Sequence, residues 1–206
     1  MTISIEMLEV GASMPAQPLP ALLTLLASRR SSSAGTLSAP APDRATLRGL
    51  LRLATHTPDH GKLSPWRFIV LEGAAKSRFV ERLEVLATSQ ENPTKALAAL
   101  AKIKNPPLTV AVISAPIEGK IPLWEQQLSA GAVCLGLLFA AHAAGFGANW
   151  ITDWYAYDDA ALALLGTTSR ERVAGYIHIG TQQEIPKERP RATLDDLISD
   201  WRADAD

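Results

Sequence analysis

The sequence predicts an α+β fold in which a small sheet is packed by helices. Short runs rich in β-branched and aromatic residues indicate strands, and they lie at 66–71, 108–115, 148–151 and 173–179. Longer segments that carry apolar residues on one face separate these runs, which is typical of helices. The connections are wide, and no tight strand–helix–strand alternation surrounds a glycine fingerprint, so a doubly wound parallel sheet is not indicated.

The composition places the chain among ordinary globular proteins. Its 206 residues fit one large domain, which we expect over 20–206, after a flexible N-terminal tail over 1–19 that shows no sustained period. Apolar residues make up 47% and charged residues 20%, which excludes wholesale disorder. The net charge of −1 argues against a dedicated nucleic-acid-binding protein. The single cysteine, Cys134, excludes an intrachain disulfide framework and a cysteine-based metal cluster.

The first half of the chain begins with helical signals. Leucines at 22, 23, 25 and 26 predict a short helix that ends near Ser28, and the Ser-, Ala-, Gly- and Pro-rich segment 31–42 predicts a loop. Asp43 is suited to cap a helix that Pro58 stops. After the strand at 66–71, two more helices are expected over 74–87 and 94–104.

The second half is dominated by a long apolar helix, predicted over 123–145. Its apolar part approaches membrane-spanning length, but it lacks flanking Lys or Arg, so we expect a buried helix and no membrane partner. Further helices are expected over 158–165 and 193–201, the latter after a Pro-rich, charged arm at 186–191. Residues 1–19 hold no Lys or Arg, so no secretory signal is indicated and a cytoplasmic location is expected.

Several familiar catalytic motifs do not occur in the sequence. No G-x-G-x-x-G follows a strand, and no P-loop, H-E-x-x-H or G-x-S-x-G is present. His56 and His60 have the i, i+4 spacing of a metal pair, but Pro58 lies between them and interrupts the helix. We therefore expect no metal site.

Three segments carry groups that suit ligand chemistry. Arg29-Arg30-Ser31 offers two planar guanidinium forks for a phosphate, or complements the negative end of a helix dipole. The proline-bounded loop 58–65 either holds fixed polar groups against a flat ligand or is a plain polar turn. The glycines at 145 and 147 either let backbone approach a ligand or cap a helix before a core strand.

Taken together, these segments resemble the nitroreductase family of flavin enzymes. The shared motifs, in order, are R-R-S at 29–31, P-D-H-G-x-x-x-P-W-R-F at 58–68, W-E-Q-x-x-S-A-G-A at 124–132, G-F-G-x-x-W at 145–150 and G-Y-x-x-I-G-T at 175–181. The resemblance covers most of residues 20–200, and the P-D-H form is similar to that of short, single-domain bacterial NAD(P)H nitroreductases.

This resemblance implies a small, mostly antiparallel central sheet in an intertwined homodimer with FMN at the subunit interface. It implies ping-pong transfer of a hydride from NAD(P)H, a transient co-substrate, to the flavin and on to a small-molecule acceptor such as a nitroaromatic or a quinone. The flavin would carry the chemistry, so no catalytic residue is expected. Two alternatives remain: a flavin-binding or flavin-sequestering protein without useful turnover, and a specialised reaction such as dehalogenation, enoate reduction or flavin fragmentation.

The resemblance also implies which residues bind the cofactor. Arg29, Arg30 and Ser31 would contact the phosphate and the ribityl chain, together with Arg189 and Arg191 of the basic C-terminal arm. The loop residues His60 and Lys62 would face the flavin, and His56 would reach it across the interface. The segment Trp150, Ile151 and Thr152 would pass beside the flavin. Two positions depart from the family pattern, because Ser33 and Ile151 stand where relatives often carry a basic residue. The aromatic residues 154, 155 and 157 form either a lid over the flavin or part of the local packing or of the dimer surface.

Overall fold

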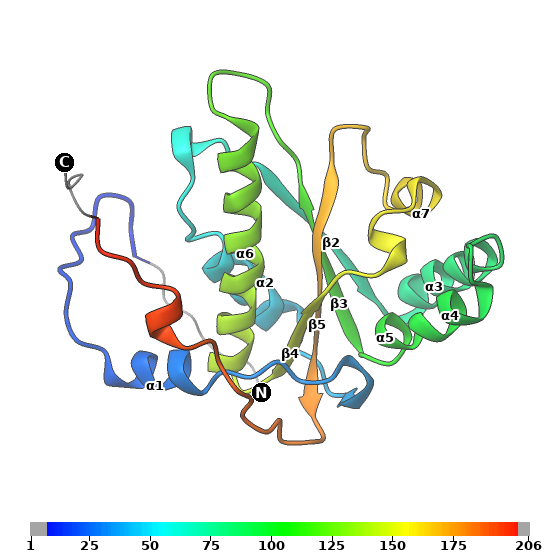
Figure 1. Ribbon diagram of the computed structural model, residues 1–206, viewed down its shortest axis with the longest axis horizontal. Helices are drawn as coiled ribbons and strands as arrows, with labels where there is room; N and C mark the ends of the chain where they lie inside the picture. Colours follow the sequence, from blue (N-terminus) through cyan, green and yellow to red (C-terminus); the bar gives the residue numbers. More distant parts are fainter. Residues whose placement is uncertain (1–7, 202–206) are drawn as a thin grey trace.

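The computed structural model describes residues 8–201. They form one five-stranded sheet with helices on both of its faces (Figure 1). Its strands run in the order β1-β5-β3-β2, and β4 also pairs with β5. The bounds are β1 Leu37–Ser38, β2 Trp66–Glu72, β3 Leu108–Ser114, β4 Gly147–Ile151 and β5 Arg172–Gln182. Every pairing is antiparallel, which confirms the predicted α+β class.

One face of the sheet is covered by α6 (Leu123–Ala143) and α2 (Arg44–Ala54), as Figure 1 shows. Alternate residues of the central strands point to this face because side chains along a strand alternate between the two sides. The core here joins Val110, Val112 and Ile177 to Val133 and Leu137 of α6. By length and composition α6 could span a membrane, but half of its most apolar stretch is buried inside this fold.

The other face is covered by a group of shorter helices. They are α3 (Gly73–Ala87), α4 (Pro93–Ala99), α5 (Ala101–Lys104) and α7 (Asp159–Leu164). Ala111, Ile113 and Tyr176 of the sheet pack here against Leu83 and Ile103. The sheet is therefore the middle layer of three (Figure 1). Strand β4 pairs with β5 on one side, and no strand of the described residues pairs with its other side.

Three predicted elements differ from the structure. The segment 31–42, predicted as loop, holds the 3₁₀ turn η1 (Ala34–Thr36) and the strand β1. The helix predicted over 94–104 is divided into α4 and α5, because the main-chain bonds around Leu100 switch to the tighter i−3 pattern. The helix predicted over 193–201 is wrong: only the turn η4 (Leu194–Asp196) forms, and its apolar side chains have no surface to pack on.

At the N-terminal end, α1 spans Pro20–Ser28 and buries none of its residues. Residues 1–7 of the predicted tail lie outside the described residues, and 8–19 are exposed and form neither helix nor strand. The flexibility of this segment and the domain boundary at residue 20 stay predictions.

Candidate functional site

A polar cavity of about 440 Å³ lies where the segment after α1 meets β4 and the C-terminal arm. Its lining includes Arg30, Ser31, Asn149, Lys187 and Arg189. These side chains come from three separate parts of the sequence, and the structure brings together three of the predicted cofactor-binding residues here: Arg30, Ser31 and Arg189. The cavity is therefore built mainly of groups that suit an anion.

Strand β4 holds the arginine-containing segment in place. The main-chain N–H of Ser32 donates to the carbonyl of Ala148 at 3.0 Å, and the Asn149 amide donates to the carbonyl of Ser32. Gly147 permits this approach, since a Cβ at that position would lie 2.8 Å from Ser32 Oγ. The segment thus lies along the outer edge of β4.

The positive charge at this cavity is concentrated. The side chain of Arg30 is only 11% exposed, and its Nε donates to the carbonyl of Lys187 at 3.3 Å. Burial, together with the neighbouring charges of Arg191 and Arg30, lowers the pKa of Arg29. Arg191 thus lies near the predicted phosphate residues, as expected. The carboxylate of Glu188 lies between two of these cations, 3.0 Å from Arg191 Nε and 3.6 Å from Arg30 Nη1.

A hydroxyl group in this cavity lacks a partner. Ser32 is 1% exposed and lines the cavity, and its Oγ makes no hydrogen bond to any residue in the described range 8–201. A buried polar atom without a partner is costly, so such an atom beside clustered arginines is suited to a phosphate oxygen. The residues present therefore fit the phosphate end of the cofactor that the sequence implies.

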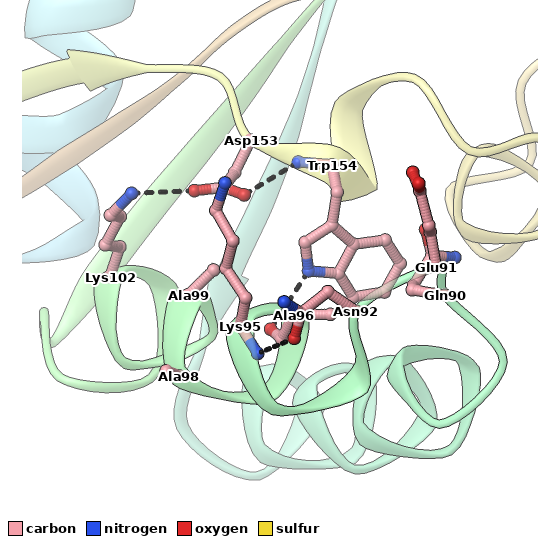
Figure 2. A pocket seen from close by; sticks show the side chains of 10 residues that line it. All are labelled: Gln90, Glu91, Asn92, Lys95, Ala96, Ala98, Ala99, Lys102, Asp153 and Trp154. Atoms are coloured by element: carbon pink, nitrogen blue, oxygen red, sulfur yellow. Dashed lines mark hydrogen bonds and ion pairs between the residues drawn. The ribbon is translucent and has the colours of Figure 1, made fainter.

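A second cavity, of about 610 Å³, lies at the other end of β4 and is drawn in Figure 2. It lies between α4, α5 and the chain that follows β4, where Lys95 and Lys102 extend toward the Asp153 loop. Lys102 Nζ is 2.8 Å from Asp153 Oδ2, and the indole N–H of Trp154 donates to the carbonyl of Ala96 at 3.1 Å.

Sequence reasoning did not find this second cavity. Lys95, Lys102 and Asp153 belong to no local motif, and only the packing of the β4 turn on α4 brings them together. For the aromatic residues 154, 155 and 157 beside them, the sequence allows a lid, local packing or a place on the dimer surface. Tyr155 is fully buried against Tyr176, so it belongs to the core and not to a lid.

The open edge of β4 runs between the two cavities. Asn149 lines the first cavity and Asp153 lines the second, and four residues of extended chain span about 13 Å. Beyond the bond from Ser32 to Ala148, no described residue makes a main-chain hydrogen bond to this edge. Trp150, Ile151 and Thr152 lie on this stretch. Because backbone groups alternate between the two edges of a strand and Ala148 faces outward, Trp150 and Thr152 turn theirs to the open edge, where an elongated ligand could meet them, and Ile151 turns its own to β5.

The loop that contains His60 and Lys62 lies at the start of α6. His60 Nδ1 is 2.6 Å from Glu125 Oε2, and the Ser129 hydroxyl donates to the carbonyl of Pro58 at 2.6 Å. Lys62 and Ser64 hold positive φ angles of 55° and 49°, which L-residues adopt only under constraint. Strained backbone of this kind is often found in functional loops.

Within one chain, however, this loop does not meet the arginine segment. His60 contacts Glu125 near the first turn of α6, whereas Arg30 contacts His142 in the last turn. Glu125 and His142 are 17 positions apart in the sequence, which corresponds to about 25 Å along the helix. His56 is exposed just beyond α2. The structure thus places the His60 loop and the arginine segment at opposite ends of α6.

Comparison with known proteins agrees with this architecture. The model of the nitroreductase family matches residues 26–181. The Escherichia coli K12 protein named "Putative NAD(P)H nitroreductase YdjA" is 33% identical over 163 residues, which cover 78% of this chain and 88% of that protein. The chain belongs to the nitroreductase family.

Solved nitroreductase structures share the fold. A nitroreductase-like family protein from Bacillus cereus superposes with a TM-score of 0.77 at 21% identity, covering 91% of this chain and 98% of that one. A "putative nitroreductase in complex with fmn" from Desulfovibrio desulfuricans gives a TM-score of 0.69 at 19% identity, covering 89% and 98%.

The two departures from the nitroreductase pattern have different surroundings. Ser33 lines the first cavity, so the position where relatives often carry a cation faces the site with a hydroxyl. Ile151 is half-buried on β4. The indole of Trp150 lies against β5, where Nε1 donates to the carbonyl of Ala174 at 3.1 Å.

Proposed function

We propose that this nitroreductase-family protein is an FMN-dependent NAD(P)H oxidoreductase. The arginine cluster around the unpartnered Ser32 hydroxyl, at one end of the open β4 edge, carries the proposal. The name of the Escherichia coli relative and the FMN complex of the Desulfovibrio protein support it. When bound, FMN supplies the chemistry, accepting a hydride from NAD(P)H and returning electrons to a second substrate.

The residues of the chain bind and orient this cofactor. Arg29, Arg30 and Arg191 supply positive charge for the phosphate, and Ser31 and Ser32 supply hydroxyl donors. The backbone of Trp150 and Thr152, at the open edge of β4, offers hydrogen-bonding groups to the edge of a flat ring system. The proposed acceptor is a nitroaromatic, a quinone or a similar flat electrophile that enters the space left by the nicotinamide.

We propose that the working unit is a homodimer in which each site uses both chains. The face of α6 that turns away from the sheet exposes apolar side chains, with Trp124 67%, Leu128 53% and Leu135 40% exposed. Figure 1 shows this helix lengthwise along one side of the sheet. Exposed apolar stripes of this kind are suited to a partner surface.

An antiparallel pairing of two α6 helices would complete the site. A twofold axis near Gly131 and Leu135 sets the first turn of one helix beside the last turn of the other. The partner's His60 would then approach the arginine segment of the first chain, although the two are about 25 Å apart within one chain. The placement of His60 and Arg30 at the two ends of α6 supports this arrangement.

Absorbance of the purified protein, followed by anaerobic titration with NADH and NADPH, tests the function. Bound yellow flavin that either nucleotide bleaches is the expected result. We expect Arg30→Gln to lower FMN affinity at least tenfold. Arg44→Gln is the control, since Arg44 in the first turn of α2 is exposed and pairs with Glu72 at the end of β2. Bound flavin that neither nucleotide reduces would favour a flavin-sequestering protein, and protein that takes up no FMN would refute the proposal.

A further inference from the structure

His142 joins the core helix α6 to the backbone of the arginine segment. Its Nε2 lies 2.9 Å from the carbonyl oxygen of Arg30, and its Nδ1 lies 2.7 Å from the carbonyl oxygen of Leu138, one turn earlier in α6. Both partners are acceptors, so each ring nitrogen makes its bond by donating. A neutral imidazole donates to one of these carbonyls, and an imidazolium donates to both.

Apart from the two hydrogen bonds between Ser32 and β4, the contacts near Arg30 give it little rigid support. The helix that precedes it, α1, buries none of its residues. The Arg30 side chain bonds to Lys187 and Glu188, which belong to the exposed C-terminal arm. His142, in contrast, follows Ala140 and Ala141, which are buried in the core beside the sheet. The imidazole therefore ties the main chain of Arg30 itself to the rigid part of the fold, whereas the β4 bonds hold the segment two residues further on.

We infer that His142 is a positioning residue for the phosphate end of the proposed flavin site. It acts through the Arg30 carbonyl, which fixes where the guanidinium of Arg30 and the hydroxyl of Ser31 are presented to the cavity. This inference rests on the proposed function, because the phosphate of FMN is the ligand that the segment would hold. It adds a residue that neither the sequence motifs nor the cavity lining had assigned to the site.

Two substitutions separate the two bonds of the ring. His142→Asn keeps a donor near the position of the ring Nδ1, so the bond to the Leu138 carbonyl can remain. It has no donor near the position of Nε2, so the bond to the Arg30 carbonyl is lost. His142→Gln places its amide closer to Nε2 and can still reach Arg30. Val133→Ala is the matched control, since it perturbs the same helix in the core without contacting the arginine segment.

The measurement is the dissociation constant of each purified apoprotein for FMN and for riboflavin, which lacks the phosphate. We expect His142→Asn to raise the FMN constant about tenfold and to leave the riboflavin constant within about twofold. His142→Gln should remain within about threefold of the wild type for both ligands, and Val133→Ala should not change their ratio.

The outcomes distinguish the inference from the function on which it rests. If the wild type prefers FMN to riboflavin and His142→Asn keeps that preference, the inference is wrong and the proposed site stands. If His142→Asn weakens both ligands equally, His142 is merely structural and the inference is wrong. If the wild type binds neither flavin, or binds both equally, the phosphate site itself is refuted.

Discussion

The indole of Trp150 lies directly on Gly175 of the neighbouring strand. The indole N–H donates to the carbonyl of Ala174 at 3.1 Å, and a Cβ built on Gly175 would overlap Nε1. The same ring reaches α6, where its outermost carbon would be 4.0 Å from a Cβ on Gly131. Trp150 thus links β4, β5 and α6 beside the open edge.

Replacing Gly175 should therefore displace Trp150. We expect Gly175→Ala to lower the free energy of unfolding by about 1–3 kcal/mol through overpacking, and to weaken FMN binding because β4 shifts. Urea unfolding, tryptophan emission and FMN titration measure the three effects. Gly119→Ala is the control, since a Cβ there meets no atom within 4 Å. Equal stability of the two variants would contradict the packing described here.

Removing the Glu188 carboxylate should strengthen anion binding. Glu188 neutralises Arg30 and Arg191 when no ligand is bound, so it competes with a phosphate for the same guanidinium groups. We expect Glu188→Gln to lower the dissociation constant for FMN about threefold, and to leave that for riboflavin unchanged. Isothermal titration at low ionic strength measures both constants. Asp195→Asn changes a charge further along the C-terminal segment and should leave both constants unchanged. A higher dissociation constant for FMN in Glu188→Gln would contradict this competition.

A charge on the exposed stripe of α6 should separate the subunits. We expect Leu128→Arg to be monomeric in light-scattering measurements and to lose bound flavin, because the partner's loop would no longer complete the site. Val85→Arg places the same charge on α3, on the opposite face of the sheet, and should remain dimeric. A monomeric wild type that binds FMN tightly would exclude the proposed shared site.

His178 should make the protein less stable in weak acid. Its ring is fully buried, and burial, together with the charge of Lys76, lowers its pKa to about 3. The unfolded chain binds this proton near pH 6.5, so between pH 6.5 and 3 the unfolded state holds more protons than the folded state. The free energy of unfolding therefore falls as pH falls, by up to about 1.4 kcal/mol per pH unit.

Urea titrations between pH 6.5 and 5 measure this dependence. In that pH range Glu171 does not change the free energy of unfolding. The hydrogen bond to Arg67 lowers the pKa of Glu171 to about 2, so the stabilisation from Glu171 is lost only below pH 4.5. His178→Gln should show a flatter dependence than the wild type, and His56→Gln, at an exposed site, should not. Equal slopes in all three proteins would contradict the assignment.

The sequence predicted elements that carry their own periodic signal. The strands at 66–71 and 108–115 and the helix at 123–145 were found to within a few residues, because their apolar patterns are long and regular. Strand β1 was missed because two residues carry no period, and only Thr181 and Gln182 of β5 define it. The helix at 193–201 was predicted from apolar spacing alone, which does not stabilise a helix without a packing surface.

The site was predictable in its residue types and less so in its arrangement. Arg30 and Ser31 were recognised from a local motif, and the fold places both beside Arg189. Lys102, Asp153 and His142 were not assigned, because their partners lie on distant segments and no spacing in the sequence marks them. The separation of His60 from Arg30 could not be foreseen either, since it depends on the length and direction of α6.

In a dimer of the proposed kind, the length of α6 is also the spacer between two equivalent reaction centres. Inserting one residue between Glu125 and His142 would turn one end of the helix by about 100° relative to the other and lengthen it by about 1.5 Å. Such a change would misalign both centres at once, whereas a substitution on the helix would alter one contact in each. The helix can thus vary in composition far more readily than in length, and differences in size between related chains are expected in the loop 115–122 and after β5.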